Sequence, residues 1–112
     1  MKIAIPLADR KLAMHFGHCE HFALVNVDAP EKKIINLEYI EAPPHQPGLL
    51  PSWLAERGVM MIIAGGMGQR ALELFAEQGI QVVLGVANET PERLVSDYLA
   101  GTLEAGKNVC DH

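Results

Sequence analysis

The sequence predicts an α/β protein in which a mixed sheet is flanked by helices, in the order β-β-β-α-β-α-β-α. Two observations predict it. In the first forty residues, short apolar runs and alternating apolar and polar residues are typical of strands. In the remainder, short apolar runs alternate with segments whose apolar residues recur at helical spacing. Helical crossovers join parallel strands, whereas a hairpin is antiparallel, so the sheet must contain both kinds of pairing. The 112 residues, 49% of them hydrophobic, fit a single domain spanning 1–112.

The first third of the chain reads as three strands. "KIAIPL" at 2–7 is a short apolar run of the buried-strand type. Residues 22–40 read as an antiparallel hairpin, because two alternating runs are separated by the turn sequence "APEKK". In the second run, Ile35, Leu37 and Tyr39 are expected on one side of the strand.

The segment "APPHQPG" is predicted to be a loop, because its three prolines exclude both a helix interior and a central strand. After it, "PSWLAERG" reads as a short helix opened by Pro51 and closed by Gly58. "VMMIIAG" then has the composition of a fully buried strand.

The last third is predicted to form a helix, a strand and a helix. "QRALELFAEQG" carries apolar residues at helical spacing, with Gly79 where a left-handed cap belongs. The strand "IQVVLGV" follows. In the next helix Thr90 is the expected N-cap and Pro91 the first helical residue, and the buried stripe comprises Leu94, Val95, Tyr98 and Leu99.

Charge and composition exclude several classes of function. The net charge of -5 and the lack of a Lys/Arg cluster argue against nucleic acid and membrane surfaces as partners. The run after Met1 is too short for a signal peptide, and no stretch approaches membrane-spanning length, so a cytoplasmic location is expected. In that compartment a disulfide between Cys19 and Cys110 is disfavoured, and ligation or redox chemistry is the better interpretation.

The stretch "HFGHCEH" predicts a metal site after the first strand. His15, His18, Cys19 and His21 fall within seven residues, and imidazole and thiolate suit zinc, copper or iron. Surface hydrogen bonding by individual histidines is the alternative. Two further candidate ligands are His45 in the proline-rich loop and Cys110 in "NVCDH". A solvated side chain explains His45 better than ligation does, and a frayed terminus explains Cys110 at least as well.

The stretch "GGMG" lies where the second buried strand turns into a helix. Glycines there let the backbone approach a ligand, and the exposed N–H groups of a helix start favour an anion such as a phosphate or the edge of a metal cluster. Tight packing of strand against helix would also explain the glycines. If the first strand runs parallel to this one, both loops lie at the same edge of the sheet.

"KIAIPL…HFGHCEHFALVNVD", "IIAGGMGQRALELFAEQGIQVV" and the closing helix resemble the dinitrogenase iron-molybdenum cofactor biosynthesis family, the small NifX-like and NifB-C-terminal-like domains. The resemblance covers nearly the whole chain. It implies an RNase H-like three-layer fold with a mixed five-stranded sheet, without the acidic set that nuclease activity needs. Residues within the two matching motifs become the cofactor-binding candidates: Phe16, Gly17, Gly65, Gly66, Met67 and Gly68.

The resemblance also implies a function, which is the binding of an iron-molybdenum or related metal-sulfur cluster or its precursor. Small stand-alone members resemble the orange protein type, which holds a molybdenum-copper sulfide cluster and is often encoded beside MinD-like ATPases. The expected role is therefore a non-enzymatic cluster carrier, with a cofactor-acceptor protein, a MinD-like ATPase or a second copy as partner. Two alternatives stay open: a small thiol or redox protein using Cys19, and a regulatory interaction domain for the ATPase.

Overall fold

The computed structural model describes residues 1–8, 11–12, 19–43, 48–86 and 89–103 of the chain. Within them lie six strands and three helices. The strands are β1 (Lys2–Ala8), β2 (Lys11–Leu12), β3 (His21–Asp28), β4 (Lys33–Glu41), β5 (Val59–Ile63) and β6 (Gln81–Val83). The helices are α1 (Leu49–Glu56), α2 (Gln69–Glu77) and α3 (Pro91–Ala100).

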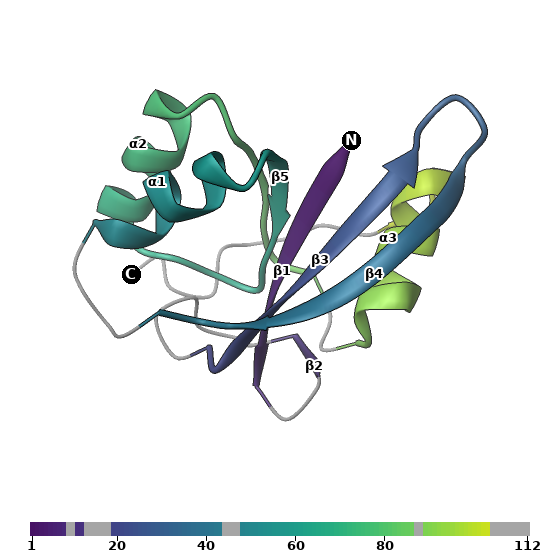
Figure 1. Ribbon diagram of the computed structural model, residues 1–112, viewed down its shortest axis with the longest axis horizontal. Coiled ribbons are helices and arrows are strands. Elements are labelled where there is room, and N and C mark those ends of the chain that lie inside the picture. Colours follow the sequence, from purple (N-terminus) through teal and green to yellow (C-terminus); the bar gives the residue numbers. More distant parts are fainter. Residues whose placement is uncertain (9–10, 13–18, 44–47, 87–88, 104–112) are drawn as a thin grey trace.

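Five strands form the body of one mixed sheet in the order β4-β3-β1-β5-β6 (Figure 1). β3 is antiparallel to both β1 and β4, whereas β5 is parallel to both β1 and β6. This confirms the mixed five-stranded α/β fold. The two-residue β2, which pairs with the end of β1, adds a strand that the sequence did not predict, since two residues are too few to show a period.

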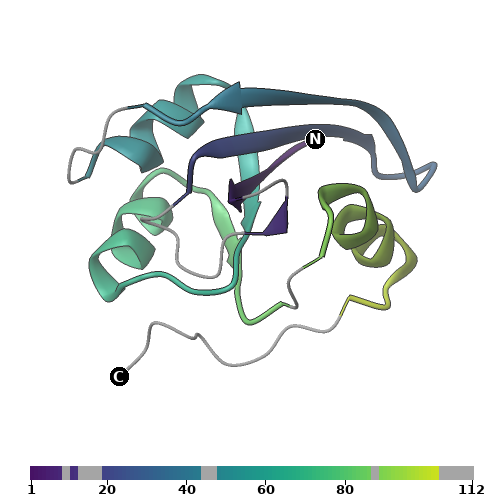
Figure 2. The ribbon, with the colours of Figure 1, turned by 90° about the horizontal axis from the view of Figure 1, so that it is seen from below.

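The helices make the outer two of three layers. Figures 1 and 2 show α1 and α2 together on one side of the molecule and α3 apart from them on the other. Each face of the sheet carries its own core. We call the first the α3-face core, and its sheet and helix residues include Ile3, Ile5, Leu7, Leu12, Ala23, Val25, Val27, Met61, Ile63, Leu94 and Val95. The second is the α1/α2-face core, which comprises Ala4, Phe22, Leu24, Leu54, Val59, Ile62, Ala64, Met67, Phe75 and Ile80.

One prediction for β4 is wrong. A register shift opposite Asn26 and Val27 leaves Ile35 as an extra residue between Ile34 and Asn36. Ile34 consequently packs against the α3-face core, whereas Ile35 is 60% exposed. Periodicity alone cannot detect such a bulge, because every residue beyond it changes face.

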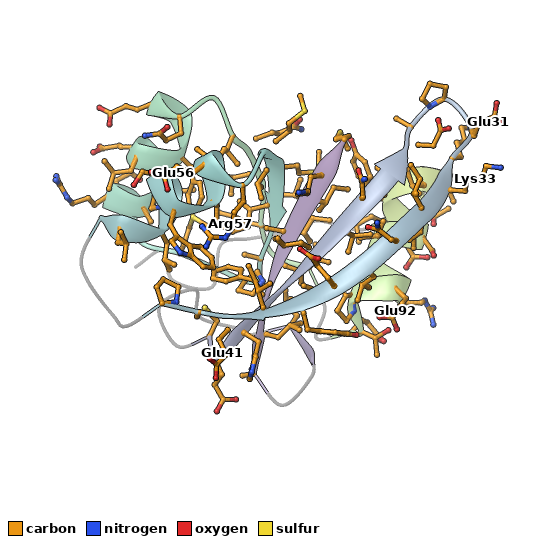
Figure 3. The ribbon with its side chains drawn as sticks, in the orientation of Figure 1. Glu31, Lys33, Glu41, Glu56, Arg57 and Glu92 are labelled. Carbon is orange, nitrogen blue, oxygen red and sulfur yellow. The ribbon has the colours of Figure 1, made fainter. Side chains whose placement is uncertain are left out.

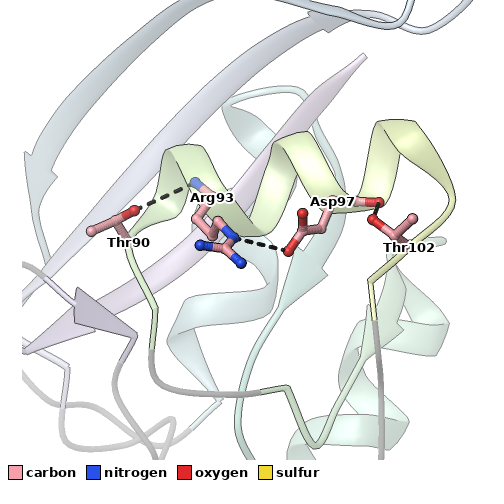
Figure 4. Close-up of polar contacts among 4 residues, drawn as sticks. All are labelled: Thr90, Arg93, Asp97 and Thr102. Atoms are coloured by element: carbon pink, nitrogen blue, oxygen red, sulfur yellow. Dashed lines mark hydrogen bonds and ion pairs between the residues drawn. The ribbon is translucent and has the colours of Figure 1, made fainter.

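The cap residues of the last two helices are confirmed. Gly79 follows α2 with a φ of 73°, a conformation that glycine adopts without penalty. Thr90 caps α3, its hydroxyl accepting a 3.4 Å hydrogen bond from the Arg93 amide, and Pro91 opens the helix (Figure 4). By contrast α1 begins at Leu49 rather than Pro51, which the first turn of a helix tolerates.

The helices that the structure describes are eight to ten residues long, and none is long and apolar enough to cross a membrane.

Candidate functional site

The predicted functional segments come together at one edge of the sheet, where β1, β4, β5 and β6 end and β3 begins. Backbone hydrogen bonds hold this carboxyl edge together. The Glu20 amide donates to the Leu7 carbonyl at 2.8 Å, and the Ala42 amide donates to the Glu20 carbonyl at 3.0 Å. On the other side of β1, the Gly85 amide donates to the Gly65 carbonyl at 2.9 Å. Because β1 and β5 are parallel, Cys19–His21 and the glycine loop 65–68 lie at the same edge, as the sequence predicted.

The glycine loop is buried at its start and exposed at its end. Gly65 and Gly66 are buried, and the Met67 side chain, only 1% exposed, is part of the α1/α2-face core. Gly68 is exposed and precedes the first residue of α2, and nothing lies within 4 Å of where a Cβ would stand. In this structure the loop therefore offers a ligand its backbone at Gly68, while the Met67 side chain packs the core.

The start of α2 is electropositive. Its N-cap is Gly68, so no side chain caps the first N–H groups, and the first turn contains no acidic residue. The first turn does contain Arg70, which is exposed. A cation at this end opposes the helix dipole and slightly destabilises the helix. The uncapped N–H groups and the Arg70 side chain would both be stabilised by a bound anion. Arg70 was not among the predicted site residues, although a basic residue in the first helical turn after a glycine loop is a signal visible in the sequence.

Cys19 lies on the α1/α2 side of this edge. Its side chain is partly buried and packs against the α1/α2-face core, to which Met67 also belongs. Burial raises the pKa of the Cys19 thiol from 9.0 to about 11, and a backbone hydrogen bond opposes this shift. The thiol is therefore protonated at neutral pH until a metal or a base displaces the proton.

The α1/α2-face core also carries a cation–π contact. The Phe22 and Trp53 ring centroids lie 5.7 Å apart, and the Arg57 guanidinium lies 3.8 Å from the centroid of Trp53. The Arg57 side chain, labelled in Figure 3, also donates to the Trp53 carbonyl at 3.0 Å. This arrangement fixes the orientation of the Trp53 ring on α1, and the Arg57 carbonyl accepts from Lys2 Nζ at the other end of β1, away from the carboxyl edge.

His21 lies at the same edge as Cys19 but on the other face. It is the first residue of β3, pairs with Leu7 and Glu41, and is exposed. Since Phe22 belongs to the α1/α2-face core and Ala23 to the α3-face core, strand alternation places the His21 side chain on the α3 face. The structure thus does not bring Cys19 and His21 together.

The other predicted site residues lie outside the described residues: His15, Phe16, Gly17, His18, His45 and Cys110. Among the residues that the structure does describe, no three His, Cys, Asp or Glu side chains gather closely enough to hold a metal ion. The predicted ligand set of "HFGHCEH" therefore stays a prediction, with Cys19 and His21 as its two placed members.

Comparison with known proteins identifies relatives across almost the whole chain. Residues 1–101 match the family described as "Dinitrogenase iron-molybdenum cofactor". The Methanocaldococcus jannaschii protein MJ0580 is 36% identical over 110 residues, which cover 93% of this chain and 90% of that protein.

Two solved structures resemble the fold. The crystal structure of PH0822 matches with a TM-score of 0.86 and 30% identity, covering 94% of both chains. The apo form of the orange protein from Desulfovibrio gigas matches with a TM-score of 0.71 and 23% identity, covering 96% of this chain and 93% of that one. The second match, at that identity, supports a shared fold.

Proposed function

Since the chain belongs to the dinitrogenase iron-molybdenum cofactor family, we propose that it binds and carries an iron-molybdenum or related metal-sulfur cluster, or a precursor of one. In this proposal the cluster is cargo and the protein catalyses no reaction on it. The observation that supports it most is the placement of Cys19 and the start of α2 on the same side of one sheet edge.

The chemistry of these two groups fits such a cargo. A thiolate is a soft ligand, suited to iron, copper and the metals of sulfide clusters, and zinc binds it as well. The uncapped N–H groups of α2 and the Arg70 side chain are suited to the anionic sulfido or oxo edge of a cluster. Cys19 would supply a metal ligand and Gly68 would present the backbone. The Gly65 carbonyl ties the start of the loop to Gly85 after β6, Gly66 is buried beside it, and Met67 holds the loop against the core.

The remaining predicted residues belong to the finer part of the proposal. His15 and His18 are the metal-ligand candidates that precede Cys19 in the sequence, and Phe16 and Gly17 complete the matching motif. His45 and Cys110 are additional candidates. His21, on the α3 face, would have to act separately from Cys19. A site with few protein ligands suits a carrier, because the cargo must pass to an acceptor protein.

The pKa of Cys19 bears on the thiol-enzyme alternative. A nucleophilic or redox-active cysteine needs a lowered pKa, so that thiolate is present at neutral pH. Burial instead raises the pKa of Cys19 to about 11. The direction of the shift favours a buried thiol that is deprotonated only when a metal binds it.

The test is anaerobic reconstitution of the full chain with iron, copper, sulfide and molybdate or tetrathiomolybdate. Desalting, elemental analysis and an absorption spectrum follow. We expect retained metal and sulfide with charge-transfer bands, and a clear loss in Cys19→Ser. Cys110→Ser serves as the comparison that separates the two cysteines.

A protein that retains no metal under any of these conditions would contradict the carrier proposal. The ATPase-docking alternative would then gain support from capture of a purified MinD-like ATPase by the metal-free protein. Surface substitutions around Trp53 on α1 should abolish that capture.

A further inference from the structure

We propose that Leu12 is a positioning residue for Cys19, and this inference deepens the proposed function and rests on it. Leu12 belongs to the α3-face core, whereas Cys19 packs against the α1/α2-face core. Leu12 acts through the backbone of the sheet edge at which Cys19 lies.

The backbone beside Cys19 is fixed through the end of β1. The Glu20 amide donates to the Leu7 carbonyl at 2.8 Å, and Leu7 pairs with His21 across the strands. Leu7 also pairs with Leu12 of β2. Leu7 thus contacts both Leu12 and Glu20, the residue that follows Cys19.

β2 has only two residues, so its ladder contributes little stability of its own. The Leu12 side chain supplies what the ladder lacks. It is only 1% exposed and is part of the α3-face core together with Leu7 and Leu94. Burial of this side chain therefore holds β2 in place.

Leu12 also ties this edge to α3. Its amide donates to the Glu89 carbonyl at 3.2 Å, directly before Thr90, which caps the helix. The edge therefore carries a nearly continuous series of backbone contacts from Ala42 through Glu20, Leu7 and Leu12 to Glu89. Removing the Leu12 side chain should weaken the pairing of Leu12 with Leu7, and through Leu7 the hydrogen bond of the Glu20 amide beside Cys19.

The test compares Leu12→Ala with Leu24→Ala. Leu24 is 3% exposed, lies in the middle of β3 opposite Ala4, and belongs to the α1/α2-face core, so its variant tests whether loosening the core against which Cys19 packs is enough to release the metal. Both substitutions delete the same buried atoms, so a loss that reflects general destabilisation should affect both. If Leu12→Ala does not fold, Leu12→Val replaces it, with Leu24→Val as its control.

Two readouts are measured for each variant. The first is hydrogen exchange in the metal-free protein at the Glu20 and Ala42 amides, compared with amides in the middle of β1. The second is the molybdenum and iron retained after anaerobic reconstitution. We expect Leu12→Ala to speed exchange selectively at Glu20 and to retain clearly less molybdenum and iron than the wild type, because the backbone beside Cys19 is then less well held. Leu24→Ala should do neither selectively.

Equal behaviour of the two variants in both readouts would overturn the positioning role. Selective exchange without selective loss of metal would also overturn it, because the edge would then loosen without effect on the ligands. If the wild-type protein retains no metal, the proposed function fails, and the positioning of a cargo ligand fails with it. In that case, faster exchange at Glu20 in Leu12→Ala alone would still show that Leu12 holds the backbone beside Cys19, and equal exchange in both variants would show that it does not.

Discussion

At the scale of single residues, Cys19 combines two properties that suit a carrier. Its side chain is partly buried against the α1/α2-face core, so the empty protein keeps the thiol protonated. A metal ion that displaces this proton gains a ligand from a defined position in the fold. The sequence indicated Cys19 as a ligand by the density of His and Cys around it, but it could not indicate the burial, which depends on the α1/α2-face core against which Cys19 packs.

The raised pKa predicts slow alkylation of Cys19 in the metal-free protein near neutral pH. The rate of iodoacetamide labelling, mapped to Cys19 by mass spectrometry, should rise with a midpoint near 11 rather than near 9.0. Since the folded state binds this proton more tightly than the unfolded state, its contribution to stability is present below about pH 9 and is lost as the pH rises toward 11. A labelling midpoint below 9 would contradict the burial argument and revive the thiol-enzyme alternative.

Arg70 predicts opposite effects on stability and on binding. In Arg70→Glu an acidic group replaces a cation in the first turn of α2, which should stabilise the helix by about 0.5 kcal/mol. Retention of an anionic cluster should fall in the same variant. Thermal unfolding and metal analysis measure the two effects.

The control for Arg70→Glu is Lys33→Glu, which makes the same change of charge. Lys33 is exposed at the first residue of β4, opposite Asp28 and at the other end of the strand from Glu41 (Figure 3). A similar loss of cargo in both variants would mean that net charge, rather than the start of α2, governs binding.

At the scale of elements, local signals were predictable and cross-strand geometry was not. Gly79 and Thr90 lie at helix ends, where a left-handed conformation or a side-chain oxygen leaves a mark in the sequence itself. The bulge at Ile35 and the pairing of β2 depend on a partner strand far along the chain. One cross-strand feature, the shared carboxyl edge, was predictable on other grounds, because helical crossovers make strands parallel and the ends of parallel strands lie at the same edge.

The assignment of candidate ligands to faces was less predictable. The spacing of Cys19 and His21 placed them together on sequence grounds, yet β3 begins at His21, so alternation applies to His21 and not to Cys19. Local sequence therefore indicated that Cys19 and His21 lie at the edge, and the start of the strand decided on which face His21 lies.

The two glycines that flank α2 predict different consequences of adding a methyl group. Gly79→Ala should destabilise the fold by about 1–2 kcal/mol, because its φ of 73° is left-handed, although nothing lies within 4 Å of the new Cβ. Gly68→Ala has an ordinary extended backbone with a φ of -71° and open space, so its cost should stay within about 1 kcal/mol.

Cargo binding should show the reverse order. A methyl group at Gly68 stands between the backbone and an approaching anion, whereas Gly79 is at the far end of α2. Urea unfolding and metal retention, measured on both variants, check the pair. Normal retention in Gly68→Ala would remove this residue from the proposed site.

At the scale of the whole molecule, one sheet separates two hydrophobic cores. Residues of both cores lie at the carboxyl edge of the sheet, where backbone contacts link them. Cys19 and Met67 belong to the core beneath α1 and α2, while Leu7 and Leu12 belong to the core beneath α3. The backbone contacts of Glu20 and Leu12 cross from one side of this edge to the other. Cargo bound beside Cys19 should therefore stabilise the whole fold rather than one loop.

That coupling predicts a large rise in thermal stability upon loading. A ligand that binds only the folded state, at about a hundredfold above its Kd, adds about 2.7 kcal/mol. For a chain of 112 residues this corresponds to a rise in Tm of about 10 °C. Differential scanning calorimetry of the reconstituted and metal-free proteins measures it. Cys19→Ser should show little rise under the same conditions, because it lacks the thiolate. An equal rise in the wild type and in Cys19→Ser would place the metal elsewhere on the chain, since binding linked to folding through this edge requires the Cys19 ligand.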